Sequence, residues 1–182
     1  MKKLSQEERN DKFVNRVIKI LVVYAAFSVC IILLFKYVFM ISSIPSSSME
    51  NTVFSGDFVF STRVGISEDS IERYDILIFT LPDDPSATYI KRVIGLPGET
   101  IVVENGKVYV DGVEIDNSFI KGYQDCKGDG TYVVPEGCYF FLGDNRNNSR
   151  DSRFWKIKYV PLENIQAVAK FVIYPFSHIE RL

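Results

Sequence analysis

A long apolar segment near the N-terminus constrains this chain more than any other feature. Residues 20–35 (ILVVYAAFSVCIILLF) contain no charged side chain, and the apolar run extends over 17–41 if Lys19 and Lys36 are tolerated within it. A helix rises about 1.5 Å per residue, so the positions between these lysines span roughly 25 Å, and both amines can reach opposite faces of a ~30 Å hydrocarbon layer. We therefore expect a retained transmembrane anchor over 17–41. A buried core helix and a cleaved signal peptide are the alternatives.

Charge is distributed unevenly around this segment. Residues 1–19 hold six Lys or Arg against three acids, and no basic residue occurs over 37–62. Because the cytoplasmic flanks of membrane helices carry the excess of positive charge, we expect residues 1–16 in the cytoplasm and 42–182 outside it, in a single-pass protein of the cell membrane. Residues 37–182 hold fourteen Lys or Arg against twenty acids. This acidic balance disfavours a nucleic-acid partner.

The part of the chain beyond the anchor has the size of one domain and a β pattern. Runs rich in Val, Ile, Tyr and Phe alternate with turn signals about every ten residues. The predicted strands lie at 57–64, 74–81, 87–95, 100–104, 107–112, 131–143 and 165–175. Asn105-Gly106 predicts a type I′ hairpin turn, because that turn needs positive φ at both central residues. We expect a mainly β fold, a coiled antiparallel sheet that closes into a barrel-like domain or packs as a sandwich.

Residues 42–56 (SSIPSSSMENTVFSG) join the anchor to this domain. Their composition is typical of a Ser-rich linker. Met49 and the flanking Ile44 and Val53 argue instead against a freely solvated tether, because apolar side chains of this size favour burial.

The three cysteines suit an extracytoplasmic domain. Cys30 lies inside the apolar segment, while Cys126 and Cys138 lie twelve positions apart in the part expected outside the cytoplasm. These two residues are compatible with a disulfide and equally with two unpaired thiols. The sequence contains no CxxC pair and no Cys/His cluster with metal-ligand spacing. We therefore expect no metal and no cofactor.

Nucleophilic catalysis by serine needs a base, and this sequence offers little histidine. The only histidine, His178, stands four residues from the C-terminus, where a surface or capping role is typical. A desolvated lysine can replace histidine, because burial lowers its affinity for a proton. Lys91 is the best candidate, since strand alternation places it with Tyr89 and Val93 on one face. The alternative is a lysine at a strand edge with its amine in water.

Three motifs follow the anchor in order. They are Ser46-x-Ser48-Met49, Lys91-Arg92-Val93-Ile94-Gly95-Leu96-Pro97-Gly98-Glu99 and Gly143-Asp144-Asn145-Arg146-x-x-Ser149-x-Asp151-Ser152-Arg153. Together they resemble the compact form of the type I signal peptidases of bacteria, and the resemblance extends over nearly the whole chain. It implies a membrane-bound serine endopeptidase that removes signal peptides from exported preproteins through a Ser/Lys dyad. The implied partners are preprotein signal peptides and membrane lipid, with small side chains preferred at positions −1 and −3.

The resemblance assigns roles to residues of the first two motifs. Ser48 corresponds to the nucleophile, and Lys91 corresponds to the general base. Ser46 corresponds to the hydroxyl that forms the oxyanion hole with the backbone N–H of Ser48. One departure lies nearby, since Asn51 stands where this family commonly has proline.

The third motif supplies the supporting residues. Ser149 corresponds to the residue that orients the lysine ammonium, and Asp151 with Arg153 corresponds to an ion pair near the site. A further departure is Tyr74-Asp75, which replaces a common Gly-Asp pair. Neither departure removes a reacting group.

Two other functions remain open on the residues alone. A self-cleaving repressor of the stress-response type is similar around its Ser and Lys, but it carries a DNA-binding module and has no membrane anchor. A membrane-tethered β domain that binds a peptide without cutting it is the second alternative.

Overall fold

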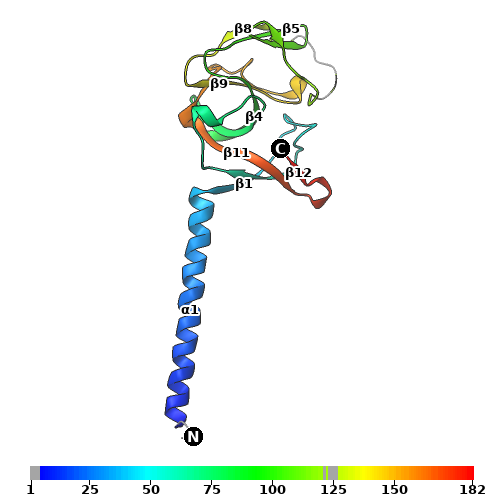
Figure 1. Ribbon diagram of the computed structural model, residues 1–182. Coiled ribbons are helices and arrows are strands. Elements are labelled where there is room, and N and C mark those ends of the chain that lie inside the picture. Colours follow the sequence, from blue (N-terminus) through cyan, green and yellow to red (C-terminus); the bar gives the residue numbers. More distant parts are fainter. Residues whose placement is uncertain (1–4, 121, 123–126) are drawn as a thin grey trace. The chain divides into compact units, whose positions relative to one another are not determined.

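The computed structural model describes residues 5–120, 122 and 127–182. The chain divides into two compact units, Met1–Val38 and Phe39–Leu182. The first unit contains the long helix, and the second unit, called the β domain below, contains the strands (Figure 1). Cys126 lies outside the described residues, so the question of a Cys126–Cys138 disulfide lies outside them as well.

Helix α1 spans Gln6–Tyr37. It begins with a capping box, in which the Ser5 hydroxyl accepts the backbone N–H of Glu8 at 3.1 Å and the Glu8 carboxylate accepts that of Ser5 at 2.7 Å. No described residue of α1 is buried, and the helix is long and apolar enough to cross a membrane. The exposed apolar surface matches a segment that is solvated by lipid rather than packed in a protein core.

The apolar run expected as one anchor divides between two elements. Residues 17–37 are helical, whereas residues 39–41 belong to strand β1 (Phe39–Ser43). Strand β1 pairs antiparallel with β2 (Phe58–Thr62) along its whole length. Backbone pairing with β2 ends the helical conformation earlier than hydropathy alone predicts, because an apolar sequence suits a buried strand and a membrane helix equally well.

Over the described residues, the main sheet of the β domain has eight antiparallel strands. Its order is β1-β2-β11-β3-β4-β9-β10, and β12 also pairs with β11. The other strands are β3 (Ile76–Leu81), β4 (Asp84–Gly95), β9 (Cys138–Leu142), β10 (Val160–Pro161), β11 (Ile165–Tyr174) and β12 (Glu180–Arg181). In the part of the chain that the structure describes, four short 3-10 helices connect the strands: η1 (Glu68–Ser70), η2 (Arg146–Asn148), η3 (Leu162–Asn164) and η4 (Phe176–His178).

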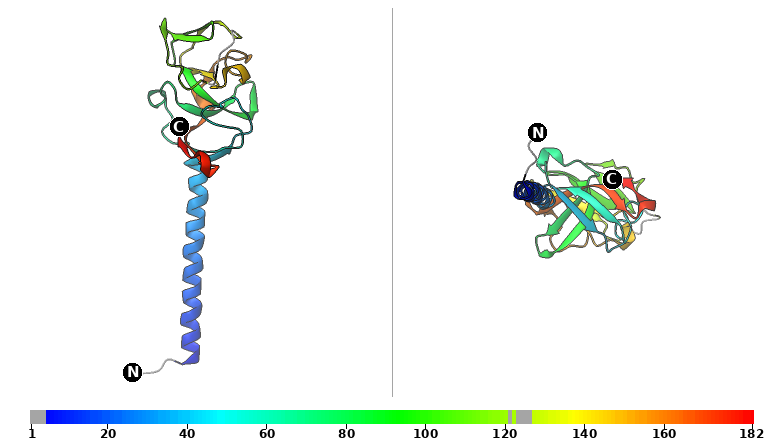
Figure 2. Two further views of the ribbon diagram at one scale, coloured as in Figure 1. Left: turned by 90° about the vertical axis from the view of Figure 1, so that its right-hand side faces the viewer. Right: turned by 90° about the horizontal axis from the view of Figure 1, so that it is seen from below.

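As far as residues are described, a second sheet contains four antiparallel strands in the order β7-β6-β5-β8. Its strands are β5 (Thr100–Glu104), β6 (Lys107–Val110), β7 (Val113–Glu114) and β8 (Gly130–Val133). The β5–β6 hairpin confirms the predicted turn, because φ is 51° at Asn105 and 77° at Gly106. In Figure 2 the green strands of this sheet lie at the opposite end of the β domain from the red C-terminal strand.

The mainly β, antiparallel prediction is confirmed, but the sheet does not close into a barrel. Within the described residues, β1 and β10 stand at the two ends of the main sheet and pair only with β2 and β9. Strands β5 to β8 lie between β4 and β9 in the sequence, and they pair with one another instead of extending the main sheet. In the described residues β4 pairs with β9 only from Arg92 onward, and the open edge of the earlier part of β4 and that of β1 flank the site described next.

Buried side chains of β3, β4 and β9 form the core beneath that site. The rings of Phe79 and Phe141 stack at 4.2 Å between centroids, and Trp155 packs against Phe79 edge-on at 5.9 Å. Each fully buried large apolar side chain contributes about 1.5–3 kcal/mol. From Ile90 onward, strand β4 is buried on both faces, so Lys91 enters the core with its strand.

Candidate active site

Ser48 lies in a tight turn that follows strand β1. The backbone N–H of Val53 donates to the carbonyl of Met49 at 2.9 Å and closes one helical turn just after Ser48. Met49 and Val53 are fully buried, and they pack in one core cluster with Ile44. Because these three apolar side chains hold the segment against the core, residues 42–56 are an ordered part of the β domain and not a solvated linker.

Asn51 gives this turn an uncommon backbone conformation. Its φ is 103°, on the positive side that asparagine tolerates better than most residues. Proline is common at this position in the family that the sequence resembles. Its φ is fixed at about −65°, so it does not fit this turn. The departure at Asn51 therefore reflects a different local turn, while Ser48 still lines the cleft described below.

Lys91 lies in the buried half of strand β4. Its Nζ donates hydrogen bonds to the Oγ of Ser48 at 2.6 Å and to the carbonyl of Ile90 at 2.7 Å. Lys91 is 4% exposed, and Ser48 is 7% exposed. The hydroxyl of Ser46 lies 3.3 Å from the hydroxyl of Ser48. The fold thus brings together three predicted site residues, although 43 positions separate Ser48 from Lys91.

Burial changes the acid–base chemistry of Lys91. Desolvation lowers the pKa of its amine from 10.5 to about 8, while the carboxylates of Asp151 and Asp144 act in the opposite direction. A useful fraction of the amine is therefore unprotonated near neutral pH. The neutral amine has a lone pair that can accept the hydroxyl proton of Ser48. The proton would move along the same Nζ–Oγ contact in which the charged ammonium donates.

A cleft of about 440 Å³ opens over this pair. Four of the predicted site residues line it: Ser46, Ser48, Lys91 and Ser149. Tyr89 also lines the cleft, as strand alternation predicts for the residue two positions before Lys91. His178 contributes nothing to this lining, and its ring contacts the carboxylate of Asp57 at 2.9 Å.

Ser149 enters the cleft without a hydrogen bond to the lysine. Its hydroxyl is buried and has no hydrogen-bond partner among the described residues. The Lys91 amine instead contacts Ser48 and the carbonyl of Ile90. A buried hydroxyl without a partner costs free energy until a neighbour or ligand satisfies it. The orienting role of Ser149 stays a prediction.

Gly143 lets the loop after β9 approach Ser48, the predicted nucleophile, closely. A Cβ atom at this position would lie 2.5 Å from the carbonyl oxygen of Ser48 and would collide with the hydroxyl of Ser149. Any side chain at Gly143 would therefore displace one of two predicted site residues. The glycine is required by space at this position, since its neighbours are backbone and a short side chain.

The turn around the predicted nucleophile Ser48 (residues 47–53, the nucleophile turn) is held by Asp144 and Asn145 of this loop and by Arg92 of strand β4. The backbone N–H of Asn145 donates to the carbonyl of Ser48 at 3.1 Å, and its side-chain amide donates to that of Ser47 at 3.0 Å. Arg92 and Asp144 form a buried ion pair at 2.6 Å. None of these three residues had a predicted role, although all of them stand within the second and third motifs. Motif membership was the available signal.

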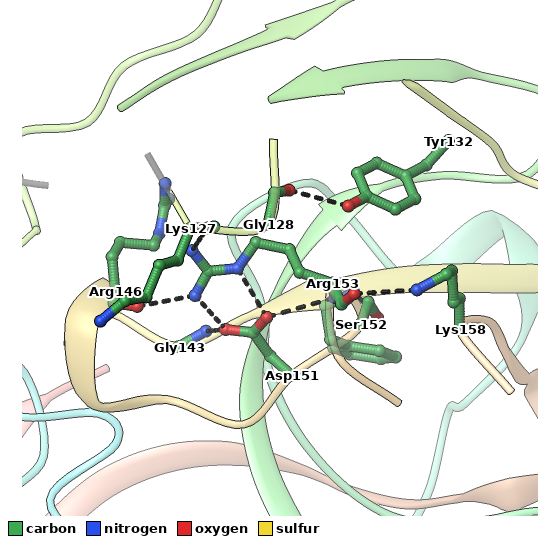
Figure 3. A network of polar contacts seen from close by, with 10 residues as sticks. Lys127, Gly128, Tyr132, Gly143, Arg146, Asp151, Ser152, Arg153 and Lys158 are labelled. Atoms are coloured by element: carbon green, nitrogen blue, oxygen red, sulfur yellow. Dashed lines mark hydrogen bonds and ion pairs between the residues drawn. The ribbon is translucent and has the colours of Figure 1, made fainter. Parts of the chain in front are cut away.

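Asp151 and Arg153 form a buried ion pair beside this loop (Figure 3). The Nε of Arg153 donates to Oδ1 at 2.8 Å, and its Nη2 donates to Oδ2 at 2.9 Å. Nη2 also donates to the carbonyl of Arg146 at 2.7 Å, and Oδ2 accepts the backbone N–H of Gly143 at 3.1 Å. The predicted supporting pair is thus in contact and ties the loop to the end of β9.

Removing the charge of Asp151 is expected to destabilise the β domain. Asp151→Asn keeps the side-chain size but leaves the Arg153 guanidinium buried beside a neutral amide. Breaking a buried pair in this way costs about 3–5 kcal/mol, measurable by urea unfolding. The matched control is Glu114→Gln, which breaks an ion pair with Lys107 whose side chains are half exposed, and little change is expected there. Equal effects of the two variants would contradict a supporting role for Asp151.

The fold and the site together define a class of protein. It is an antiparallel β domain in which a buried lysine amine contacts a serine hydroxyl, the pairing found in Ser/Lys hydrolases. Residues 14–174 match the family described as signal peptidase, peptidase S26. The chain belongs to this family.

Individual proteins of the family are similar over most of the chain. A Signal peptidase I of Rickettsia canadensis (strain McKiel) is 32% identical, and the match covers 81% of this chain and 76% of that protein. A Signal peptidase I of Rickettsia typhi (strain ATCC VR-144 / Wilmington) is 29% identical over 90% of this chain and 83% of that protein. The crystal structure of a signal peptidase I from Enterococcus faecalis V583 is 32% identical and covers 54% of this chain and 95% of that chain, with a TM-score of 0.47.

Proposed function

We propose that this chain is a membrane-bound serine endopeptidase that cleaves N-terminal signal peptides from exported preproteins. One observation carries the proposal: the Nζ of Lys91 lies 2.6 Å from the Oγ of Ser48, and both residues are buried. Membership of the signal peptidase family points to the same substrate class. Ser48 acts as the nucleophile and Lys91 as the general base.

The proposed reaction is acyl transfer to Ser48. Neutral Lys91 accepts the hydroxyl proton as Oγ bonds to the scissile carbonyl carbon, and the carbonyl oxygen becomes an oxyanion held by the Ser46 hydroxyl and the Ser48 N–H. Collapse breaks the C–N bond, and the leaving amine takes the proton from Lys91. Neutral Lys91 then takes a proton from water, whose oxygen attacks the ester. The second collapse returns that proton to Ser48 Oγ and releases the signal peptide as a carboxylic acid, which ionises.

The peptide is proposed to bind between strands β1 and β4. A pocket of about 260 Å³ lies there, and residues of both strands line it, including Met40 and Ile44 on one side and Ile90 on the other. Within the described part of the chain, β1 pairs only with β2, so its other edge is free to bond an extended peptide. Apolar walls around a small volume favour short apolar side chains, as the family resemblance implies for positions −1 and −3.

Helix α1 is proposed to anchor the enzyme with its N-terminus in the cytoplasm. The charged residues 1–16 precede the apolar part of the helix, and the positive-inside rule then places the β domain outside the cytoplasm. A signal peptide also inserts an apolar segment into the bilayer. Enzyme and substrate would therefore meet in two dimensions, which raises their effective concentration.

The direct test is cleavage of a preprotein by the detergent-solubilised full chain. The expected result is one new N-terminus at the end of the signal peptide, identified by mass spectrometry. The matched control is the same preprotein with a large charged residue in place of the small side chain at position −1, which should remain uncut. Intact preprotein after prolonged incubation with the wild-type chain would overturn the proposal and favour a peptide-binding domain.

The pH dependence of cleavage should report the lysine. Because Lys91 must be neutral to accept the Ser48 proton, activity is expected to rise with pH until the amine is mostly deprotonated. With its pKa lowered to about 8, kcat/KM should increase about 50-fold between about pH 6 and pH 8 and level off above about pH 9. Initial rates at low preprotein concentration give this profile. A profile that is flat over this range would contradict the assignment of Lys91 as the base.

A further inference from the structure

The nucleophile turn is attached to a distant part of the chain through Asn51. Its side-chain Nδ2 donates to the backbone carbonyl of Phe119 at 2.9 Å, across 68 positions of sequence. Asn51 lies three positions after Ser48 and adopts a φ of 103°. An asparagine here serves two purposes, since it tolerates positive φ and carries a donor that glycine does not have.

Phe119 contacts the same region with its ring. The ring covers the guanidinium of Arg92 at 4.3 Å, a cation–π distance, and meets the ring of Tyr74 edge-on at 5.6 Å between centroids. Arg92 is 9% exposed. The aromatic face therefore shields this buried cation from water, which strengthens the ion pair that the cation makes on its other side.

Arg92, which the ring of Phe119 covers, also contacts the nucleophile turn. Its guanidinium binds both carboxylate oxygens of Asp144, at 2.9 Å and 2.6 Å. It also donates to the hydroxyl of Thr52 at 3.1 Å, and that hydroxyl donates to Asp144 at 2.6 Å. Thr52 directly follows Asn51. Phe119 thus reaches adjacent residues of the turn by two routes, one through its carbonyl and one through its ring.

We propose that Asn51 and Phe119 form a clasp that positions Ser48 for attack. Both are positioning residues, because they act through the turn and do not contact the reacting atoms. Phe119 follows strand β7 of the second sheet, and Ser48 follows strand β1 of the main sheet. The clasp therefore connects segments that come from the two sheets. The inference rests on the proposed function, since it adds positioning residues to the Ser48 site.

The chemistry at Ser48 explains why such a clasp matters. The hydroxyl must keep its 2.6 Å contact with Lys91 while facing the substrate carbonyl. Small displacements of a nucleophile reduce the rate of the chemical step more than they reduce binding. Loss of the clasp should therefore lower kcat and leave KM nearly unchanged.

The experiment compares two changes at Asn51 that both tolerate its positive φ and that both remove the side-chain amide. Asn51→Gly keeps the positive φ and removes the donor, and kcat is expected to fall about fivefold, as for one lost hydrogen bond. Asn51→Asp also tolerates this φ, but a carboxylate facing the Phe119 carbonyl repels it, so kcat should fall further, by about tenfold or more. Phe119→Leu, which removes the ring face from Arg92, should resemble Asn51→Gly.

Matched controls use Asn105, the asparagine of the β5–β6 hairpin. It also has positive φ, at 51°, and its side chain has no assigned role in the site. Asn105→Gly and Asn105→Asp should leave kcat within twofold of wild type. The double variant Asn51→Gly/Phe119→Leu should lose little more kcat than the worse single variant, because both changes open one clasp.

Hydrogen exchange provides a readout that does not depend on turnover. Amide exchange over residues 47–53 should accelerate in Asn51→Asp and in Phe119→Leu and should stay unchanged in the Asn105 variants. Unchanged exchange over 47–53, full kcat in both Asn51 variants, or a rise in KM alone would each overturn the clasp. Failure of the wild-type chain to cleave any preprotein would count against the proposed function and would leave the exchange result to decide the clasp.

Discussion

Ser48→Ala is expected to abolish preprotein cleavage, with a loss of kcat of at least about a thousandfold. The hydroxyl oxygen is the only atom removed, and it is the one that contacts the Lys91 amine at 2.6 Å. Without it no acyl-enzyme can form, and the lysine alone lacks a nucleophile to activate. Single-turnover cleavage of a radiolabelled preprotein, followed by gel electrophoresis, measures the loss.

The matched control for this change is Ser55→Ala in the same segment. The Ser55 side chain is exposed and donates to the carbonyl of Pro45 at 3.2 Å, so cleavage should stay within twofold of wild type. Ser48→Ala should also keep the thermal midpoint of the wild-type chain, because its neighbours Met49 and Val53 still fill the core. Residual cleavage above a hundredth of the wild-type rate in a folded Ser48→Ala protein would end its assignment as nucleophile.

Lys91→Arg and Lys91→Met are each expected to lower kcat by at least about a thousandfold. Arginine keeps a positive charge near the same place but cannot release its proton, since its pKa lies far above neutral pH in proteins. The pair of variants therefore separates a base from a fixed charge. Lys107→Arg, at an exposed lysine of the second sheet, is the matched control and should have wild-type activity. Cleavage by Lys91→Arg within tenfold of wild type would show that the lysine serves as a charge.

Lys91→Met carries a second expectation that concerns stability. The folded state lowers the lysine pKa from 10.5 to about 8, so folding disfavours the charged form. Below about pH 8 the ammonium is charged and desolvated in the folded state. This desolvation lowers the free energy of unfolding by about 3 kcal/mol, at 1.36 kcal/mol per pKa unit. Lys91→Met should therefore be more stable than wild type at pH 7, and its advantage should shrink as the pH rises from about 8 toward 10.5. Urea unfolding at two pH values measures this difference.

Local signals predicted the strands well because their determinants are local. Runs of Val, Ile, Tyr and Phe bounded by turn residues mark strands in this chain, and β5 over Thr100–Glu104 matches its prediction residue for residue. The Asn105-Gly106 turn was predictable because positive φ at two successive positions depends on the residues themselves. The end of the helix was less predictable, because the apolar residues 39–41 suit a helix and a strand equally well. Only their pairing with β2 makes them a strand.

The shape of the sheet was beyond such local signals. Closure into a barrel requires the first and last strands to pair, and strand pairing depends on partners far apart in sequence. Here β5 to β8 form their own sheet, and among the described residues β1 pairs only with β2. The same non-local pairing brings β1 and β4 to the two sides of the proposed peptide site, where a closed barrel would leave no edge.

The amino-acid sequence by itself determined the apolar helix, the β class and the residue types of a Ser/Lys site, because these depend on composition, period and motif order. Only the tertiary structure decided that Lys91 is desolvated enough for its pKa to fall to about 8. It also decided that the Lys91 amine lies within hydrogen-bond distance of Ser48. It also decided that Arg92, Asp144 and Asn145 hold the nucleophile turn. Desolvation and contact are properties of neighbours in space, and strand pairing over tens of residues supplies those neighbours.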